Sequence, residues 1–136
     1  MQKIYFAASI SAGRDDQPIY EKIVDALKQY GSVATEIIGS PDLLAAGENL
    51  SDHEVHRRDV AWLTESDCVV AEVTTPSLGV GYEIGLATTM KKPVLCLYRP
   101  SARSKLSSMI AGCSLVQVRP YVDAGEIPAL LQEFFS

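Results

Sequence analysis

The sequence predicts an α/β fold, a three-layer sandwich in which helices cover both faces of a five-stranded parallel sheet. Two observations predict this class. Short apolar segments alternate with helical segments along the chain, and no linker, repeat or low-complexity stretch interrupts the alternation. A chain of 136 residues is long enough for one hydrophobic core, so we expect a single domain over residues 1–136.

The predicted strands are short runs of apolar and β-branched residues bounded by polar or turn-forming residues. Such runs are typical of strands that are buried in a parallel sheet. In chain order, the predicted strands span residues 3–9, 32–38, 67–73, 93–98 and 114–120.

The predicted helices carry recognisable start and stop signals. Pro18 lies near the start of the first helix and Gly31 at its expected end, where these residues are favoured. Ser51 and Glu54 have the spacing of a capping box and open the second helix. In chain order, the predicted helices span residues 16–31, 51–66, 80–91, 104–112 and 126–135.

Five strands in this alternation favour the flavodoxin-like (Rossmann-like) strand order. In such open sheets, ligands bind in a crevice at the carboxyl ends of the strands. The loops that follow the first, third and fourth strands are therefore the expected location of the chemistry.

The charge of the chain argues against a nucleic-acid polymer as partner. The net charge is −5, and the only basic pairs are Arg57–Arg58 and Lys91–Lys92, whereas a polymer partner requires a basic stripe. A small anionic ligand remains compatible, held by local dipoles and a few donors. The first apolar stretch is too short for a signal peptide and no run is long enough to span a membrane, so we expect a cytoplasmic protein without membrane contact.

The cysteines and histidines predict neither a metal site nor a cofactor. Cys68, Cys96 and Cys113 show no CxxC spacing, and we expect reduced, mostly buried thiols. His53 and His56 lie on the charged side of a predicted helix, with too few further ligands for a metal.

The loop after the first strand is a candidate anion site. It contains Ser9, Ser11, Gly13 and Arg14, whose small side chains and donors would let backbone N–H groups approach a phosphate ahead of a helix. The alternative is a simple strand-to-helix turn.

The stretch 74–85, "TTPSLGVGYEIG", is the second candidate. Gly79, Gly81 and Gly85 are spaced G-x-G-x-x-x-G after the third strand, so they do not form a dinucleotide fingerprint. Ser77, Gly79 and the start of the next helix are nevertheless suited to hold a phosphate.

Glu83 follows these glycines and is predicted to lie in the first turn of that helix, at the mouth of the crevice. The helix dipole would there favour the ionised form, which suits a nucleophile or an electrostatic stabiliser. The alternative is a carboxylate that only stabilises the helix.

Asp59 occupies an unusual position for a carboxylate. It lies four residues after Val55, on the apolar side of its predicted helix, while Arg57 and Arg58 are expected to point elsewhere. Burial would raise its pKa, as a general acid requires. The alternative is an aspartate hydrogen-bonded to a neighbouring loop.

Tyr5 lies inside the first predicted strand. Most tyrosines at such positions serve only to pack their ring, but the Tyr5 hydroxyl could instead reach the site at the strand ends. Together with Glu83 and Asp59 it suggests glycosidic-bond cleavage. Two carboxylates in different environments are the minimum for that reaction.

The assembled motifs resemble the nucleoside 2-deoxyribosyltransferase superfamily, and within it the N-hydrolases of 2'-deoxynucleoside 5'-monophosphates. The resemblance extends over nearly the whole chain. It is carried by "IYFAASISAGRDD", "AEVTTPSLGVGYEIG", "LCLYRP" and "LSSMI", of which the second is the most specific.

The resemblance implies a homodimer that releases a free base and 2-deoxyribose 5-phosphate. It implies that Glu83 is the nucleophile, that Asp59 handles the proton of the base and that Tyr5 orients the nucleophile. Ser107 would reach the phosphate in the site of the other subunit. The further substrate-binding residues implied are Ser9, Ser11, Gly13, Arg14, Tyr20, Ser77, Gly79 and Met109.

The sequence also departs from this pattern. Ser11 stands where mammalian-type members have arginine, Ala8 and Ala12 where they have glycine, and Ile37 where they have histidine. The loss of this cationic contact argues against a strict requirement for the 5'-phosphate, although Arg14 remains in the loop. The alternatives are a deoxyribosyltransferase that acts on free nucleosides and a non-catalytic nucleotide-binding module.

Overall fold

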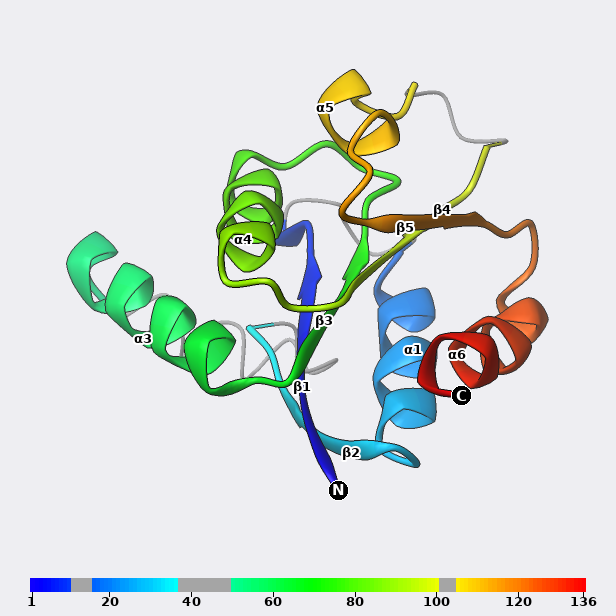
Figure 1. The fold of residues 1–136 in the computed structure, drawn as a ribbon, viewed down its shortest axis with the longest axis horizontal. Coiled ribbons are helices and arrows are strands. Elements are labelled where there is room, and N and C mark those ends of the chain that lie inside the picture. Colours follow the sequence, from blue (N-terminus) through cyan, green and yellow to red (C-terminus); the bar gives the residue numbers. More distant parts are fainter. Residues whose placement is uncertain (11–15, 37–49, 101–104) are drawn as a thin grey trace.

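A computed structural model describes residues 1–10, 16–36, 50–100 and 105–136. Within these residues, five parallel strands form one sheet in the order β2-β1-β3-β4-β5 (Figure 1). This confirms the predicted fold class. The strands are β1 (Gln2–Ala8), β2 (Gly31–Ala34), β3 (Cys68–Glu72), β4 (Val94–Tyr98) and β5 (Gln117–Pro120).

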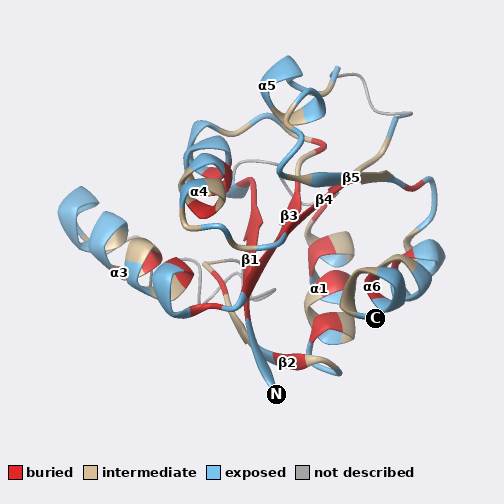
Figure 2. Ribbon diagram, viewed as in Figure 1, coloured by how far each residue is buried: buried red, intermediate tan, exposed pale blue. Residues whose placement is uncertain are grey.

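Helices cover both faces of the sheet. α1 and α6 pack on one face, and α3 and α4 pack on the other (Figure 1). Buried residues are concentrated on the central strands and on the inward sides of the helices (Figure 2). The helices are α1 (Gln17–Leu27), α3 (Asp52–Glu65), α4 (Leu78–Thr89), α5 (Ser108–Ala111) and α6 (Ile127–Phe135), with a 3-10 turn at Ala124–Glu126.

The alternation of side chains along β1 decides which residues can reach the site. Ile4 and Phe6 belong to the core under α1 and α6, whereas Tyr5 and Ala7 belong to the core under α3 and α4. Tyr5 therefore lies on the same side of the sheet as α4.

Gly31 opens β2, so the prediction that it ends the first helix was wrong. It is paired with Gln2 in the parallel ladder. A Cβ at this position would lie 1.9 Å from the backbone oxygen of Gln2, so the close approach of the two strands requires glycine. The helix ends earlier, at Leu27.

The predicted start of α4 was also wrong, by two residues. Ser77 caps the helix and Leu78 is its first residue, so Glu83 lies in the second turn rather than the first. In contrast, the capping box of Ser51 and Glu54 at the start of α3 is confirmed. None of the described helices is long and apolar enough to cross a bilayer.

Candidate active site

Tyr5 and Glu83 meet at the centre of the candidate site. The Tyr5 hydroxyl donates a hydrogen bond to Glu83 Oε2, which joins β1 to α4. Burial, and next the Glu83 carboxylate, raise the pKa of Tyr5 far above its usual range. Tyr5 thus remains a protonated donor that fixes the orientation of Glu83.

Glu83 is partly buried, and burial is the main cause that raises its pKa to about 7. The hydrogen bond from Tyr5 lowers this pKa, while the nearby Asp59 carboxylate raises it. We predicted from the helix dipole that Glu83 would be ionised. Glu83 lies beyond the first turn, where the effect of the helix dipole has fallen off, and a pKa of about 7 leaves its carboxyl group partly ionised and partly protonated at neutral pH.

A second group of charges lies across from Glu83. Asp59 is 8 % exposed, which confirms its predicted inward position on α3. The prediction that Arg58 points away from Asp59 was wrong, because the Arg58 Nε donates to Asp59 Oδ1 at 3.0 Å. Its Nη2 donates to Glu36 Oε1 at 2.7 Å, and its guanidinium lies 4.8 Å from the centre of the Trp62 ring.

Glu36 is a candidate residue that the sequence analysis missed. It follows β2, and burial together with the Asp59 carboxylate raises its pKa, so it tends to hold a proton. The sequence analysis placed residue 36 inside a strand predicted over 32–38, whereas β2 ends at Ala34, so Glu36 lies at the carboxyl edge of the sheet.

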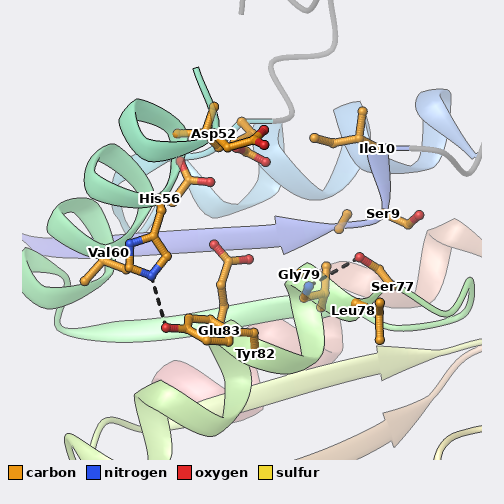
Figure 3. A pocket seen from close by; sticks show the side chains of 15 residues that line it. Ser9, Ile10, Asp52, His56, Val60, Ser77, Leu78, Gly79, Tyr82 and Glu83 are labelled. Carbon is orange, nitrogen blue, oxygen red and sulfur yellow. Dashed lines mark hydrogen bonds between the residues drawn. The ribbon is translucent and has the colours of Figure 1, made fainter. Parts of the chain in front are cut away.

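A cavity of about 590 Å³ brings these groups together between α3 and α4. Figure 3 shows Glu83 between two ends of this space, one with Ser9, Ser77 and Gly79 and the other with His56 and Val60 of α3. Among the described residues, the lining consists of Ala8, Ser9, Ile10, Glu36, Asp52, Val55, His56, Asp59, Val60, Ser77, Leu78, Gly79, Val80, Tyr82 and Glu83. The arrangement is an apolar cleft with carboxylates on two sides and small polar groups at one end.

His56 contributes to the rim rather than to a metal site. Its Nε2 lies 3.0 Å from the Tyr82 hydroxyl, so the pair connects α3 with α4 at the mouth of the cavity (Figure 3). Over the parts of the chain that the structure describes, no three His, Cys, Asp or Glu side chains are grouped as a metal site would require.

The family of the chain follows from comparison with known proteins. The profile described as nucleoside 2-deoxyribosyltransferase matches residues 4–118. The chain belongs to the nucleoside 2-deoxyribosyltransferase family.

Two relatives named 5-hydroxymethyl-dUMP N-hydrolase are similar over nearly the whole chain. The protein of Esox lucius is 48 % identical over 98 % of this chain and 95 % of its own length. The protein of Homo sapiens is 46 % identical over 98 % of this chain and 79 % of its own length.

Solved structures share the fold of this family member at lower identity. The CMP N-glycosidase of Clostridium botulinum has a TM-score of 0.70 at 20 % identity, covering 97 % of this chain and 99 % of that one. The 2-deoxyribosyltransferase of Bacillus psychrosaccharolyticus has a TM-score of 0.64 at 15 % identity, with coverage of 92 % and 89 %.

The structure places some of the predicted binding residues of this deoxyribosyltransferase-family protein in the cavity. Ser9 is buried beside it, and Gly79 lines it. Ser77 also lines it and accepts a hydrogen bond from the backbone N–H of Val80 at 3.3 Å. The predicted Ser11, Gly13 and Arg14 lie outside the described residues, as does Ile37.

Tyr20 does not line this cavity. It projects from α1, which covers the opposite face of the sheet, and its ring packs edge-on against Phe6 with the ring centres 6.2 Å apart. The predicted role of Tyr20 in substrate binding therefore has no support from its position.

Ser107 and Met109 lie at a second cavity of about 470 Å³, next to α5. The same cavity is bordered by Ser77 and Leu78 at the start of α4, so it adjoins the first. Ser107 caps α5 and accepts from the backbone N–H of Met109 at 3.2 Å. Neither residue is among those that line the first cavity.

Proposed function

We propose that this protein hydrolyses the N-glycosidic bond of 2'-deoxynucleoside 5'-monophosphates to a free base and 2-deoxyribose 5-phosphate. The observation that carries the proposal is the hydrogen bond from Tyr5 to Glu83, which lines a cavity together with Asp59. A module that only bound nucleotides would have no need of two inward-facing carboxylates. The names of the relatives that are 48 % and 46 % identical describe the same class of reaction.

Glu83 acts as the nucleophile in this proposal. Its ionised carboxylate attacks the anomeric carbon, the bond from that carbon to the base nitrogen breaks, and a glycosyl ester forms on Glu83. Tyr5 holds the attacking carboxylate in place. Water then attacks the same carbon, which releases 2-deoxyribose 5-phosphate and restores the carboxylate.

The group of Asp59 and Glu36 handles the proton of the departing base. A leaving base nitrogen must gain a proton, and a carboxyl group whose pKa is raised is suited to supply it near neutral pH. Arg58 binds both carboxylates and so keeps the pair in one geometry. The water molecule that attacks the glycosyl ester returns its proton to these carboxyl groups.

The polar end of the cavity receives the 5'-phosphate. Ser9 and Ser77 provide hydroxyls, and the start of α4 provides backbone N–H groups and a positive dipole end. The cavity wall formed by Val55 and Val60 of α3 suits the flat face of a base.

The test is a comparison of substrates. The protein is incubated with deoxynucleoside 5'-monophosphates, including 5-hydroxymethyl-dUMP, with the matching free nucleosides and with ribonucleotides, each with and without an acceptor base. We expect base release from the monophosphates in water alone. Equal turnover of free deoxynucleosides, or a requirement for the acceptor base, would favour a deoxyribosyltransferase instead.

The proposal includes a homodimer in which Ser107 contributes to the site of the partner. Leu78 is 97 % exposed and Met109 is 83 % exposed, and both border the second cavity. Large apolar side chains gathered at one surface are typical of an interface. Because the second cavity adjoins the first at Ser77, a partner docked there would lie close to the phosphate end.

A further inference from the structure

A buried ion-pair network lies beyond the candidate cavity, at the carboxyl edge of the sheet. Glu72 ends β3 and is 1 % exposed. Its carboxylate accepts from the backbone N–H and the hydroxyl of Thr74, each at 2.8 Å, and from the hydroxyl of Tyr121. Tyr121 belongs to the core under α1 and α6, so the network extends to the face of the sheet opposite Glu83.

Arg99 connects this carboxylate to the start of α1. Its Nη1 lies 3.8 Å from Glu72 Oε2, and its Nη2 donates to Asp16 Oδ1 at 2.7 Å. The guanidinium also lies over the Tyr121 ring, 5.9 Å from the ring centre. Arg99 is the arginine of the "LCLYRP" motif, to which the proposed reaction assigns no task.

A contribution to folding stability does not by itself explain the network of Glu72, Tyr121 and Arg99. Burial raises the pKa of Glu72, against the hydrogen bonds from Tyr121 and Thr74 and the charge of Arg99. Buried ion pairs recover little net stability, because the loss of hydration offsets their attraction. What such a pair supplies is a defined geometry between the segments that it joins.

Two further hydrogen bonds extend that geometry into the loop that follows β3. The backbone N–H of Arg99 donates to Thr74 Oγ1 at 3.1 Å, and Thr75 Oγ1 donates to Asp16 Oδ2 at 3.3 Å. Ser77 follows two residues after Thr75, caps α4 and lines the candidate cavity. The end of β3, the end of β4 and the start of α1 thus hold the segment that presents Ser77.

We propose that Arg99 is a positioning residue for the phosphate end of the cavity, acting through Asp16 and Thr75 on the loop that carries Ser77. The inference rests on the proposed function, since it assumes that the 5'-phosphate binds at Ser77. Arg99 itself is not among the residues that line the candidate cavity. Its loss therefore weakens phosphate recognition more than it weakens the bond-breaking step.

The experiment compares Arg99→Met and Thr75→Val with Arg119→Met as the matched control. Arg119 is half-buried on β5, forms a pair with Glu133 at 3.6 Å and lines neither of the two cavities. The measurements are kcat and KM for a monophosphate, inhibition by 2-deoxyribose 5-phosphate and by unphosphorylated 2-deoxyribose, and the melting temperature.

For Arg99→Met we expect KM to rise and inhibition by 2-deoxyribose 5-phosphate to weaken by about tenfold, with kcat within about threefold of wild type. Inhibition by unphosphorylated deoxyribose should stay unchanged. Thr75→Val, which removes only one hydrogen bond, should change KM in the same direction by a smaller factor, and it decides the matter if Arg99→Met does not fold. Arg119→Met should leave all constants unchanged.

Two results would overturn the inference while leaving the proposed function intact. In the first, the wild type releases the base, and Arg99→Met and Thr75→Val both have the KM of the wild type. The other is an equal loss for phosphorylated and unphosphorylated ligands together with a lower melting temperature, which would indicate a merely structural network. A wild-type protein that releases no base from monophosphates would overturn the proposed function and this inference together.

Discussion

At the scale of single residues, the contact between Tyr5 and Glu83 balances two opposing requirements. Burial raises the pKa of Glu83 to about 7, whereas attack on a sugar requires the ionised form. The Tyr5 hydroxyl offsets part of this effect, since it donates to the carboxylate and stabilises its charge.

The first prediction concerns the nucleophile. Glu83→Gln should retain the fold and bind substrate, but base release should fall by several orders of magnitude, because an amide cannot form the glycosyl ester. Initial rates, substrate affinity and melting temperature measure this. Rapid quenching of the wild type should also trap a deoxyribosyl adduct on the peptide that contains Glu83.

The matched control is Glu21→Gln, on an exposed position of α1. It should be indistinguishable from the wild type. Near-normal turnover by Glu83→Gln would show that the glutamate serves only the fold.

The second prediction concerns Tyr5. A carboxyl group whose pKa is about 7 is protonated below that pH, so kcat/KM of the wild type should rise as the pH increases through about 7. Tyr5→Phe removes the interaction that lowers this pKa, so the rise should move to higher pH. An unchanged rate together with an unshifted pH profile would contradict the role of this hydrogen bond and leave Tyr5 as a packing residue.

The third prediction concerns the carboxyl groups opposite Glu83. Glu36 and Asp59 are proposed to handle the proton of the base, and burial raises the pKa of Glu36 to about 8, so kcat/KM should fall again at alkaline pH as Glu36 loses its proton. Glu36→Gln should reduce or remove this alkaline fall. Asp59→Asn should slow base release, and less strongly for bases that leave easily; equal slowing for all bases would argue against proton transfer.

At the scale of elements, α3 and α4 both begin with a serine cap but border the cavity differently. Ser51 caps α3 with a reciprocal contact to Glu54 on an exposed surface. Ser77 caps α4 where the helix start faces the cavity. The same local chemistry thus serves the fold at one helix and, in our proposal, the fold and the ligand at the other.

The fourth prediction separates these two contributions. Ser51→Ala and Ser77→Ala should each reduce the free energy of unfolding by about 1 kcal/mol, the usual value of a serine cap. Ser77→Ala should in addition raise KM for a monophosphate by about tenfold, because a contact to a charged group is lost. Denaturant unfolding and steady-state kinetics measure both, and an unchanged KM in Ser77→Ala would remove it from the phosphate site.

At the scale of the whole molecule, the proposed dimer makes each site depend on two chains. The fifth prediction is a complementation experiment in which Glu83→Gln and Ser107→Ala proteins are mixed and allowed to exchange subunits. A mixed dimer would combine one intact Glu83 with Ser107 of the other chain. About a quarter of the wild-type activity should therefore return.

No recovery of activity in a mixture that demonstrably exchanges subunits would place Ser107 outside the partner's site. Sedimentation of the wild type at assay concentration gives the independent check. A fully active monomer would contradict the dimer itself.

Much of the architecture follows from the sequence alone. The alternation of apolar runs and helical segments predicts the parallel sheet and its strand order, and the spacing of Ser51 and Glu54 predicts a helix start. The inward position of Asp59 also follows from its distance to Val55 along one helix. The helix start and the inward position of Asp59 depend on residues that are close together in the chain, so periodicity and capping chemistry are sufficient to reveal them.

Only the tertiary structure decides the electrostatics of the site. Glu83 meets a hydroxyl that lies 78 residues away in the chain, and Arg58 turns toward a glutamate 22 residues away. Whether Glu83 is ionised, why Glu36 joins Asp59 and why Tyr20 faces the other core depend on burial and on distances across the sheet. A pKa is set by the neighbours and the solvent around a group in three dimensions, and sequence spacing does not contain that information.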